Sequence, residues 1–372
     1  MRNKKILFLV PYPYDKAPSQ RLKFEQYYTH FEENGFRVEK SSFVSETFWQ
    51  VIYKKGYWLQ KLFYTCGGYI RRVKDLFRIR RYDIIYVHLW VTPFGFPFFE
   101  WLVCTLAKKV IYDIDDLVYL ADSKSNVNKI IAGLKGKNKP VFLMKQADHV
   151  ITCTPYLDTF VRKYNQQTTD ISSTIDTEKY RPKTDYSIQG RKIIFGWSGS
   201  HSTSKYLYLL EPVFRQLQKE GIVFQLLVMG DAGFHIEGIE TEALPWKESY
   251  ETTVIGRFDI GLYPLPDEQW VYGKSGLKAL QYMAAGVPAI ATAIGANFRI
   301  IEDGVTGFLA RDEKDWVHYL KLLAQDENLR RNIGLAGAAM VGKKFSIHAN
   351  KEVYLSILHR VITGSSFDKR FP

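Results

Sequence analysis

The chain alternates apolar runs of strand length with helical patterns along most of its length. The first run, Lys5–Val10, is almost continuously apolar, as expected of a strand that is covered on both faces. Asp83–His88, Lys109–Tyr112 and Ala147–Cys153 repeat the pattern, and helical segments separate them. This alternation predicts the α/β class, in which helices cover both faces of a parallel sheet.

The second half of the chain repeats this plan after a polar segment, Arg181–Arg191, whose proline and glycine predict a linker. In the first half we expect helices at Arg21–Asn34, Phe98–Ala107 and Pro155–Tyr164, and a further strand at Arg37–Ser42. In the second half we expect strands at Ile193–Trp197, Phe224–Met229, Thr252–Ile255 and Ile260–Tyr263, a helix near Tyr206–Lys219, and closing helices at Trp316–Leu323, Glu327–Val341 and Ile347–Ile362. A length of 372 residues suits two domains. We expect the last helix to cross back to the first domain and a tail from about Gly364 to fray.

Composition and charge narrow the classes of function. No apolar run approaches the roughly 18 residues of a membrane span, and Ile6–Val10 is too short for a signal-peptide core. Three widely spaced cysteines argue against a disulfide frame or a zinc cluster and favour a reducing compartment, so we expect a cytoplasmic protein. The net charge of +12 suits an anionic partner such as a nucleoside diphosphate, a lipid head group or a nucleic acid. Nucleic acid is the least favoured, because zinc-finger, helix-turn-helix and RNP patterns are absent from the sequence.

The segment Asp267–Leu309 carries the most information about a ligand. It predicts a loop, a helix, a short strand at Ala289–Thr292, a second glycine loop and a hairpin. The helix begins in a Gly-Lys-Ser-Gly element, where Ser275 can cap it, and ends at Gly286. A helix that begins in a glycine loop offers unpaired N–H groups and the positive end of its dipole to an anion, and Lys274 adds a full charge beside them.

Polar residues follow the strands of the first domain, where a ligand is expected. The loop after the first strand lacks the GxGxxG of a dinucleotide binder, but Ser19 and Arg21 begin a helix there, and Arg21 can grip a phosphate or carboxylate. The run Asp113–Asp116 places three carboxylates at a strand end, where Asp113, Asp115 and Asp116 can bind sugar hydroxyls, act as a base or hold a divalent ion. Loop capping is the alternative for the carboxylates, and a structural role is the alternative for His88 at another strand end.

The second domain has matching loops. Trp197 is followed by small donors, among them Ser198, Gly199 and Ser200, and the run ends in Lys205. Such a loop before a helix suits phosphates, with an ordinary surface lysine as the alternative. Two further positions after strands are expected to line a donor site, namely Gly230 and Trp246, the latter either as the wall of a base pocket or as plain core.

Residues 49–82 interleave basic and aromatic side chains. Nine of them are Lys or Arg and one, Asp75, is acidic. This pattern suits an anionic membrane surface or a lipid-linked anion, and a solvated helical excursion is the alternative. The first interpretation places the protein at the inner face of the plasma membrane.

Taken together, these residues resemble a retaining glycosyltransferase of the GT-B fold, in the large glycosyltransferase family 4. The resemblance spans nearly the whole chain and is most specific in YGKSGLKALQYMAAGVPAIATAIGANFRIIEDGVTGFL, with weaker matches in WSGSHSTSKYL, DIDDLVY and STIDTEKYRP. It implies two Rossmann-like domains with parallel sheets facing a central cleft. Residues 1–185 would bind an acceptor, 186–345 would bind a nucleotide sugar of UDP or GDP type, and 346–372 would form the crossover helix and tail. It also implies sugar transfer to a glycan or lipid-linked acceptor, without a metal or other cofactor.

The family carries a Glu-x7-Glu pattern that falls on Gly273 and Gln281 here, so neither position is acidic. The resemblance implies that Gln281 accepts hydrogen bonds from the ribose through its carbonyl oxygen. The first acid of the family lies near the sugar, so with Gly273 in its place the residue that contacts the sugar is not identified. Asp267 or Glu268 can substitute for that acid.

The resemblance also distributes charge around the leaving diphosphate. Lys205 matches the family's lysine, and Lys274 supplies the second positive charge because serines stand near the family's arginine position. The backbone N–H groups of Gly276 and Leu277 would hold the distal phosphate. Asp115 stands where the family often has histidine, and would orient the donor sugar or the acceptor hydroxyl.

Three functions fit this sequence. The first is a sugar transferase in bacterial surface-polysaccharide or lipid-linked glycan synthesis. The second is a nucleotide-sugar epimerase or hydrolase on the same fold. The third is a non-catalytic GT-B subunit, which the missing acids at Gly273 and Gln281 keep open.

Overall fold

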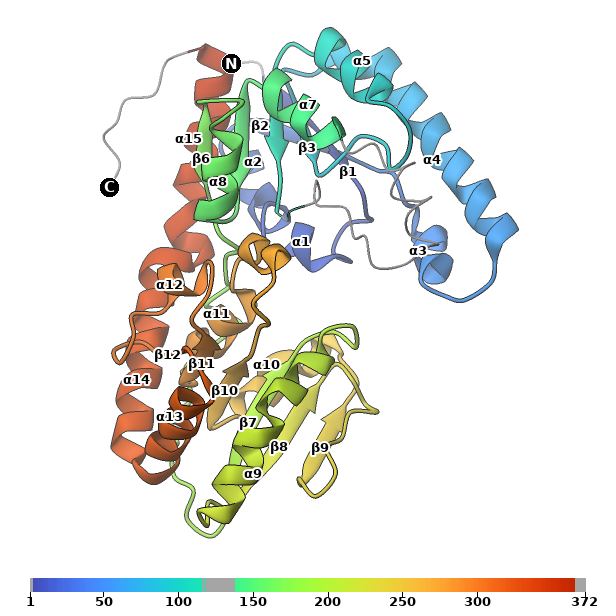
Figure 1. The fold of residues 1–372 in the computed structure, drawn as a ribbon. Coiled ribbons are helices and arrows are strands. Elements are labelled where there is room, and N and C mark those ends of the chain that lie inside the picture. Colours follow the sequence, from blue (N-terminus) through green and yellow to red (C-terminus); the bar gives the residue numbers. More distant parts are fainter. Residues whose placement is uncertain (1–2, 116, 118–137, 365–372) are drawn as a thin grey trace. The chain divides into compact units, whose positions relative to one another are not determined.

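The computed structural model describes residues 3–115, 117 and 138–364. Its contacts divide the chain into two compact units. Unit 1 contains Met1–Ser172 and Asn350–Pro372, and unit 2 contains Ser173–Ala349. Figure 1 shows a parallel sheet with flanking helices in each unit. The α/β class is confirmed.

Unit 1 is built on a six-stranded parallel sheet in the order β2-β1-β3-β4-β5-β6. The strands are β1 (Lys4–Val10), β2 (Phe36–Ser42), β3 (Ile84–His88), β4 (Val110–Asp113), β5 (His149–Thr152) and β6 (Thr168–Asp170). The helices are α1 (Pro18–Arg21), α2 (Tyr28–Glu33), α3 (Glu46–Ile52), α4 (Trp58–Arg78), α5 (Phe98–Leu106), α7 (Asn138–Gln146) and α8 (Pro155–Val161), with 3₁₀ turns at Glu25–Tyr27 and Ile79–Arg81. The apolar runs of β1 and β3 are buried because helices cover both faces.

Unit 2 is built on a second six-stranded parallel sheet, in the order β12-β11-β10-β7-β8-β9. The strands are β7 (Ile193–Ser198), β8 (Phe224–Met229), β9 (Thr241–Leu244), β10 (Ile260–Tyr263), β11 (Ala289–Thr292) and β12 (Phe308–Ala310). The helices are α9 (Glu211–Lys219), α10 (Glu251–Gly256), α11 (Leu277–Ala284), α12 (Asn297–Ile300), α13 (Glu313–Gln325) and α14 (Glu327–Met340), with 3₁₀ turns at Ser204–Leu210, Glu248–Tyr250 and Gln269–Gly273 and a π-helical turn at Val341–Phe345. Counted within the unit, the strand order is the 3-2-1-4-5-6 order of Rossmann folds.

The last helix, α15 (Ile347–Thr363), returns to unit 1, as the sequence predicts. Its Tyr354 is buried there, with its ring centroid 4.6 Å from that of Tyr27 and 6.4 Å from that of Phe31. A buried aromatic cluster therefore fixes α15 against the first sheet's helices. The expected tail beyond Gly364 lies outside the described residues.

One expected helix of unit 1 and the expected linker differ from the prediction. The helix expected over Arg21–Asn34 is broken into α1, a 3₁₀ turn and α2, because the chain turns at Lys23 to bury that lysine against Asp113. The segment expected as a linker packs on unit 2 instead. Its Tyr186 hydroxyl donates to the carbonyl of Gly286 over 2.9 Å, and Arg191 is paired with the fully buried carboxylate of Asp259.

Two expectations for unit 2 are also wrong. Thr252–Ile255 lies in helix α10, and the strand of that region is β9, which the sequence does not predict because it is a half-buried edge strand with polar residues. The hairpin expected before Leu309 is a tight turn at Asp303–Gly307, after which β12 pairs parallel with β11.

Candidate active site

The sheet of unit 2 has a topological switch point, where successive strands are added on opposite sides of the starting pair. Strands β7 and β10 are neighbours, but β7 leads to β8 on one side and β10 leads to β11 on the other. In open α/β sheets, ligands bind outside the carboxyl ends of the strands at such a point. The candidate site therefore lies beyond Ser198 and Tyr263, where these two strands end.

Lys278 stands at this point. Its Nζ lies 4.6 Å from the ring centroid of Trp197 at the end of β7 and 5.5 Å from that of Tyr263 at the end of β10. The same atom lies 3.4 Å from the hydroxyl of Thr203. Burial lowers the pKa of Lys278 to about 7, and the charge of Lys274 contributes. An anion bound beside Lys278 would stabilise its charged form and raise this pKa again.

The sequence pattern does not single out Lys278 as a site residue. Lys278 lies outside the apolar face of its helix, so its position in the sequence is typical of a solvent-exposed lysine. The available signal was its place in the first turn of the helix that begins in the glycine loop, where a cation can reach the same anion as the N–H groups.

The loop after β7 is held tightly against its surroundings. The backbone N–H of Ser198 donates to the hydroxyl of Tyr282 on α11 over 2.9 Å, and the N–H of Gly199 donates to the carbonyl of Met229 over 2.9 Å. A Cβ atom at Gly230, whose φ is +113°, would lie 1.7 Å from the carbonyl oxygen of Gly199. Glycine at position 230 therefore allows the two loops to approach.

Past Gly199 the loop presents hydroxyl groups. Ser200 Oγ lies 2.9 Å from Ser202 Oγ and 3.3 Å from Thr203 Oγ1, and Ser200 is exposed. Ser204 donates to Asp231 over 2.5 Å, which fixes the far end of the loop. The predicted donor loop is thus ordered locally, with several hydroxyls facing solvent.

The two lysines selected from the sequence flank one aromatic pair. The rings of Tyr206 and Trp270 are 5.6 Å apart. Lys205 places its Nζ 5.3 Å from the Tyr206 ring, and Lys274 places its Nζ 5.6 Å from the Trp270 ring. The structure thus brings Lys205 and Lys274 into one neighbourhood and adds Lys278, which lies in the first turn of α11 just after Lys274.

The start of α11 differs from the prediction in its cap. Gly276 is the N-cap residue, with φ of +76°, and no side chain of the described part of the chain caps this helix. Ser275 does not cap it, because its Oγ lies 2.8 Å from that of Ser173. The first-turn N–H groups, beginning with that of Leu277, therefore keep the capacity to bind an anion.

Gln281, also on α11, begins a chain of hydrogen bonds to residues outside the helix. Its amide donates to the Tyr180 hydroxyl over 2.6 Å, and that hydroxyl donates to Glu251 over 2.7 Å. Glu251 also accepts from the indole N–H of Trp246 over 2.8 Å. Trp246 is 42% exposed, so it is not plain core. Glu251 was missed because its segment was interpreted as leading into a strand.

The strand ends of unit 1 hold a buried charge cluster. Asp113 is fully buried and accepts hydrogen bonds from Lys23 and Tyr86, and Nδ1 of His88 lies 3.5 Å from its Oδ1. Burial alone would raise the pKa of Asp113, but the Lys23 ammonium and the hydrogen bonds hold that pKa below its usual value. His88 is fully buried in this cluster, and Lys23 was not selected from the sequence.

The other first-domain candidates are less constrained. Asp115 is half-buried, and its backbone carbonyl accepts from the Cys153 thiol over 3.1 Å. Asp116 lies outside the described residues. Ser19 and Arg21 are half-buried on the short helix α1. No group of His, Cys, Asp and Glu in the described ranges is arranged to hold a metal ion.

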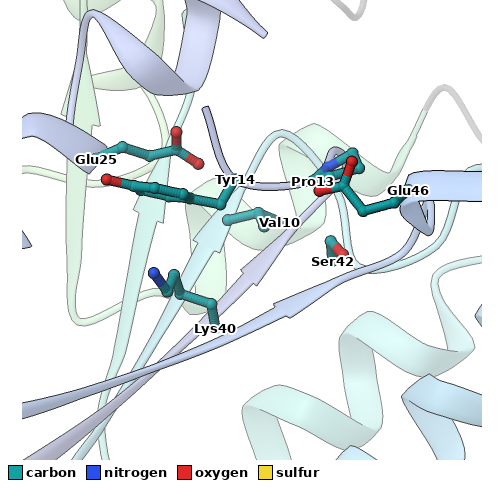
Figure 2. A pocket seen from close by; sticks show the side chains of 7 residues that line it. All are labelled: Val10, Pro13, Tyr14, Glu25, Lys40, Ser42 and Glu46. Carbon is teal, nitrogen blue, oxygen red and sulfur yellow. The ribbon is translucent and has the colours of Figure 1, made fainter. Parts of the chain in front are cut away.

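Unit 1 also has a cavity of about 150 Å³ beside the ends of β1 and β2, shown in Figure 2. Lys40 and Tyr14 are in contact there, with Nζ 3.9 Å from the ring centroid. Burial raises the pKa of Glu25, which accepts from the backbone N–H of Asp15 over 2.9 Å. The cavity's lining residues are Val10, Pro13, Tyr14, Glu25, Lys40, Ser42 and Glu46. None of them was predicted as a site residue.

Part of the second unit is similar to a known family. Residues 192–326 match the family model described as Glycosyl transferases group 1. The matched range contains β7, β10 and α11, and therefore the whole neighbourhood of Lys278.

Curated relatives match over short stretches. D-inositol 3-phosphate glycosyltransferase of Arthrobacter sp. is 33% identical over 99 residues, which is 26% of this chain and 23% of that protein. Trehalose synthase of Pyrococcus horikoshii is 35% identical over 85 residues, which is 23% of this chain and 20% of that protein. The match thus spans less than a quarter of the length of these relatives.

Solved structures match over almost the whole chain. Sucrose-phosphate synthase of Thermosynechococcus elongatus aligns with a TM-score of 0.70 at 16% identity, covering 97% of this chain and 100% of that one. HepE of Anabaena, in complex with UDP and glucose, aligns with a TM-score of 0.65 at 14% identity, covering 96% and 99%. A glycosyltransferase of Rickettsia africae aligns with a TM-score of 0.69 at 13% identity, covering 98% and 100%. The fold is that of the GT-B glycosyltransferase structures.

Proposed function

We propose that the protein is a retaining glycosyltransferase that moves a sugar from a nucleoside-diphosphate sugar to a glycan or lipid-linked acceptor in cell-surface polysaccharide synthesis. The observation that carries this proposal is the position of Lys278 at the topological switch point between β7 and β10, beside the start of α11, which no side chain of the described residues caps. It lies within the range that matches a glycosyltransferase family model.

The charges of the site fit the chemistry of a leaving diphosphate. As the bond between sugar and phosphate breaks, negative charge grows on the diphosphate and positive charge grows on the sugar. Lys274 lies just before α11, Lys278 lies in its first turn and Lys205 lies in the 3₁₀ turn Ser204–Leu210, so all three can stabilise the leaving group together with the first N–H groups of α11. We assign Lys278 to this role in addition to the two lysines expected from the sequence.

The remaining predicted residues receive roles around this centre. Ser198, Gly199, Ser200 and Gly230 would shape the phosphate loop, and Trp246 would flank the base. Gln281 would face the ribose from its hydrogen bond with Tyr180. In unit 1, Asp115, Ser19 and Arg21 would contact the acceptor, with His88 supporting them through Asp113.

A specific observation keeps a second candidate in view. The positions of the two family acids are Gly273 and Gln281, and the amide of Gln281 is already bound to Tyr180. A GT-B protein that binds a nucleotide sugar without transferring it would have such a site.

The test is a donor screen. The protein is incubated with UDP-, GDP-, ADP- and TDP-sugars, with and without glycan and lipid-linked acceptors, and release of the nucleoside diphosphate is measured. UDP-glucose comes first, because the similar HepE was solved with UDP-glucose and with UDP and glucose. Acceptor-dependent release supports transfer, and nuclear magnetic resonance of the product then shows whether the anomeric configuration is retained.

Each other outcome counts against the proposal. Release that does not depend on an acceptor indicates a hydrolase or epimerase. Binding without release indicates the non-catalytic alternative. A product of inverted configuration contradicts retention while leaving transfer intact.

A further inference from the structure

Helix α4 of unit 1 buries a charged pair and exposes a row of apolar side chains to solvent. On its inner face, the side chain of Arg72 is buried, pairs with the buried carboxylate of Asp75 over 3.1 Å and donates to the carbonyls of Val91 and Val10 over 2.8 and 2.9 Å. The same face presents Gly68, where a Cβ atom would lie 2.7 Å from the Phe43 ring. The charged pair of α4 is therefore packed into the unit beside Tyr64 and Tyr69, while another, apolar side of the helix is left outside.

The outer face of α4 is an apolar stripe. Exposed residues recur along it at alternating spacings of four and three, which places them on one side of an α-helix. They are Leu59, Phe63, Cys66, Ile70, Val73 and Phe77. Phe63 is 74% exposed and Phe77 is 86% exposed, values that are unusual for phenylalanine on a folded protein.

The stripe continues onto neighbouring elements. Figure 1 shows α4 on the outside of unit 1 with α5 beside it. Tyr69 links the two, because its ring lies 5.6 Å from that of Phe99 and its hydroxyl donates to the carbonyl of Phe94. Exposed aromatic side chains lie on this adjoining part too, namely Phe94, Phe96, Phe98 and Trp101. We call these residues and the α4 stripe the α4–α5 face.

The exposed charges of residues 49–82 have one sign. Lys54, Lys55 and Lys74 are exposed, as are Arg80 and Arg81 at the end of the helix. The acid of residues 49–82, Asp75, is buried and paired, and Glu100 on α5 is buried and accepts from the backbone N–H of Thr92. A seam that pairs with another helix usually carries charges of both signs at its edges, whereas this face offers exposed charges of one sign from residues 49–82.

We propose that the α4–α5 face docks on an anionic lipid bilayer, with α4 lying in the plane of the interface. Phe63, Phe77 and their neighbours would enter the boundary between head groups and acyl chains, and the exposed lysines and arginines would meet the anionic head groups. No helix in the described ranges is long and apolar enough to cross a membrane, so contact through α4 would be peripheral. The inference is independent of the proposed sugar transfer, because it rests on unit 1 alone.

Vesicle pelleting of the full chain tests this inference. The vesicles are phosphatidylcholine alone, or phosphatidylcholine mixed with phosphatidylglycerol, each at low and high salt. We expect pelleting with the anionic vesicles that weakens as salt rises. The double variant Phe63→Ser/Phe77→Ser should lower the partition coefficient at least about tenfold, since each buried phenylalanine contributes strongly to membrane transfer. Lys54→Gln/Lys55→Gln/Lys74→Gln should lower it for anionic vesicles alone.

Matched controls come from unit 2. Val223→Ser/Leu335→Ser removes two exposed apolar side chains, and Lys219→Gln/Lys314→Gln removes two exposed charges, so neither should change the partition coefficient. Because the substituted side chains of the α4–α5 face are exposed, the variants should unfold at the wild-type temperature. Absence of pelleting, or pelleting that the Phe63→Ser/Phe77→Ser variant leaves unchanged, overturns the inference. A dimer in sedimentation velocity that the same variant dissociates also overturns it, and assigns the face to a second copy of the chain.

Discussion

Lys278 is the residue on which the account of the donor site depends most. Its ammonium contacts two aromatic rings and one hydroxyl. A bound diphosphate would add an ion pair, which is a much stronger interaction for a half-buried charge. Lys278→Met keeps most of the side-chain volume and removes the charge. We expect a loss of transition-state stabilisation of about 2–4 kcal/mol, by analogy with other preorganised charge-stabilising groups. Steady-state kinetics of donor consumption measures it, and Lys219→Met, at the opposite end of the strands, is the control.

The low pKa of Lys278 predicts a pH effect on nucleotide binding. In the free protein the ammonium loses its proton as pH rises through about 7, whereas a bound diphosphate favours the charged form. Binding at pH 8 should therefore take up a proton, and the affinity should fall above neutral pH. Calorimetry in two buffers of different ionisation enthalpy measures the uptake. Equal binding enthalpies in both buffers, or equal uptake by Lys278→Met, would contradict it.

The same residue predicts an unusual stability profile. The folded pKa of about 7 lies below the ordinary value of 10.5, so the unfolded chain binds more protons between these values. The destabilisation is absent above about pH 10.5, grows as pH falls and is complete below about pH 7. Lys278→Met should therefore unfold at a higher temperature than wild type, with a difference that widens from pH 10 to pH 7. A variant that unfolds earlier than wild type at pH 7 would show a structural role instead.

At the scale of elements, the approach of the two loops in unit 2 is testable through glycine. Gly230→Ala would place a Cβ atom 1.7 Å from the Gly199 carbonyl oxygen, whereas Gly221, with a similarly positive φ of +81°, has open space around it. Both alanine variants strain the backbone, but overpacking should cost Gly230→Ala roughly 1–3 kcal/mol more. Urea unfolding measures the difference. Equal losses in the two variants would mean that the loops do not need this approach.

A second element-scale prediction concerns the inner face of α4. Arg72→Met removes one of the two guanidinium groups that pair with the buried Asp75, leaves Arg78 as the other, and also removes the hydrogen bonds from Arg72 to the carbonyls of Ser41, Val10 and Val91. Removing one member of a buried pair usually costs about 3–5 kcal/mol, and we expect the lower end of this range because Arg78 still faces Asp75. Urea unfolding should show this loss, and Arg80→Met on the exposed side should leave stability unchanged. A loss below about 1 kcal/mol for Arg72→Met would contradict the assignment of Arg72 as the anchor of the helix.

How well an element was predicted depended on how deeply it is buried. Strands such as β1 and β3 are covered on both faces, so their apolar runs are visible in the sequence. β9 is a half-buried edge strand, and its polar residues hide it. The break at Lys23 and the packed segment around Tyr186 were invisible because each depends on a partner far along the chain, Asp113 and Gly286 respectively.

The site was predicted in the same uneven way. The glycine loops and Lys274 follow from local spacing, because a helix that begins in such a loop has a known electrostatic end. Lys278 and Glu251 were missed because their significance comes from rings and hydroxyls contributed by other strands and turns. Ser275 was wrongly expected to cap α11, because the sequence does not show that Ser173 lies beside it.

At the scale of the whole molecule, two Rossmann-like units repeat one plan with different strand-end chemistry. Unit 2 has a lysine cluster beside an uncapped helix start, while the strand ends of unit 1 bury an ion pair and leave Asp115 half-exposed. This difference supports the proposal that unit 2 binds the charged donor and unit 1 the acceptor. The central claim is that a nucleoside diphosphate binds at the ends of β7 and β10.

Hydrogen exchange of the whole protein, followed by mass spectrometry with and without each of UDP, GDP, ADP and TDP, tests that claim most directly. We expect one nucleotide to slow exchange in peptides covering residues 198–204 and 273–281, and Lys278→Met to weaken this protection. Protection confined to other strand ends, or none with any of the four nucleotides, would contradict it.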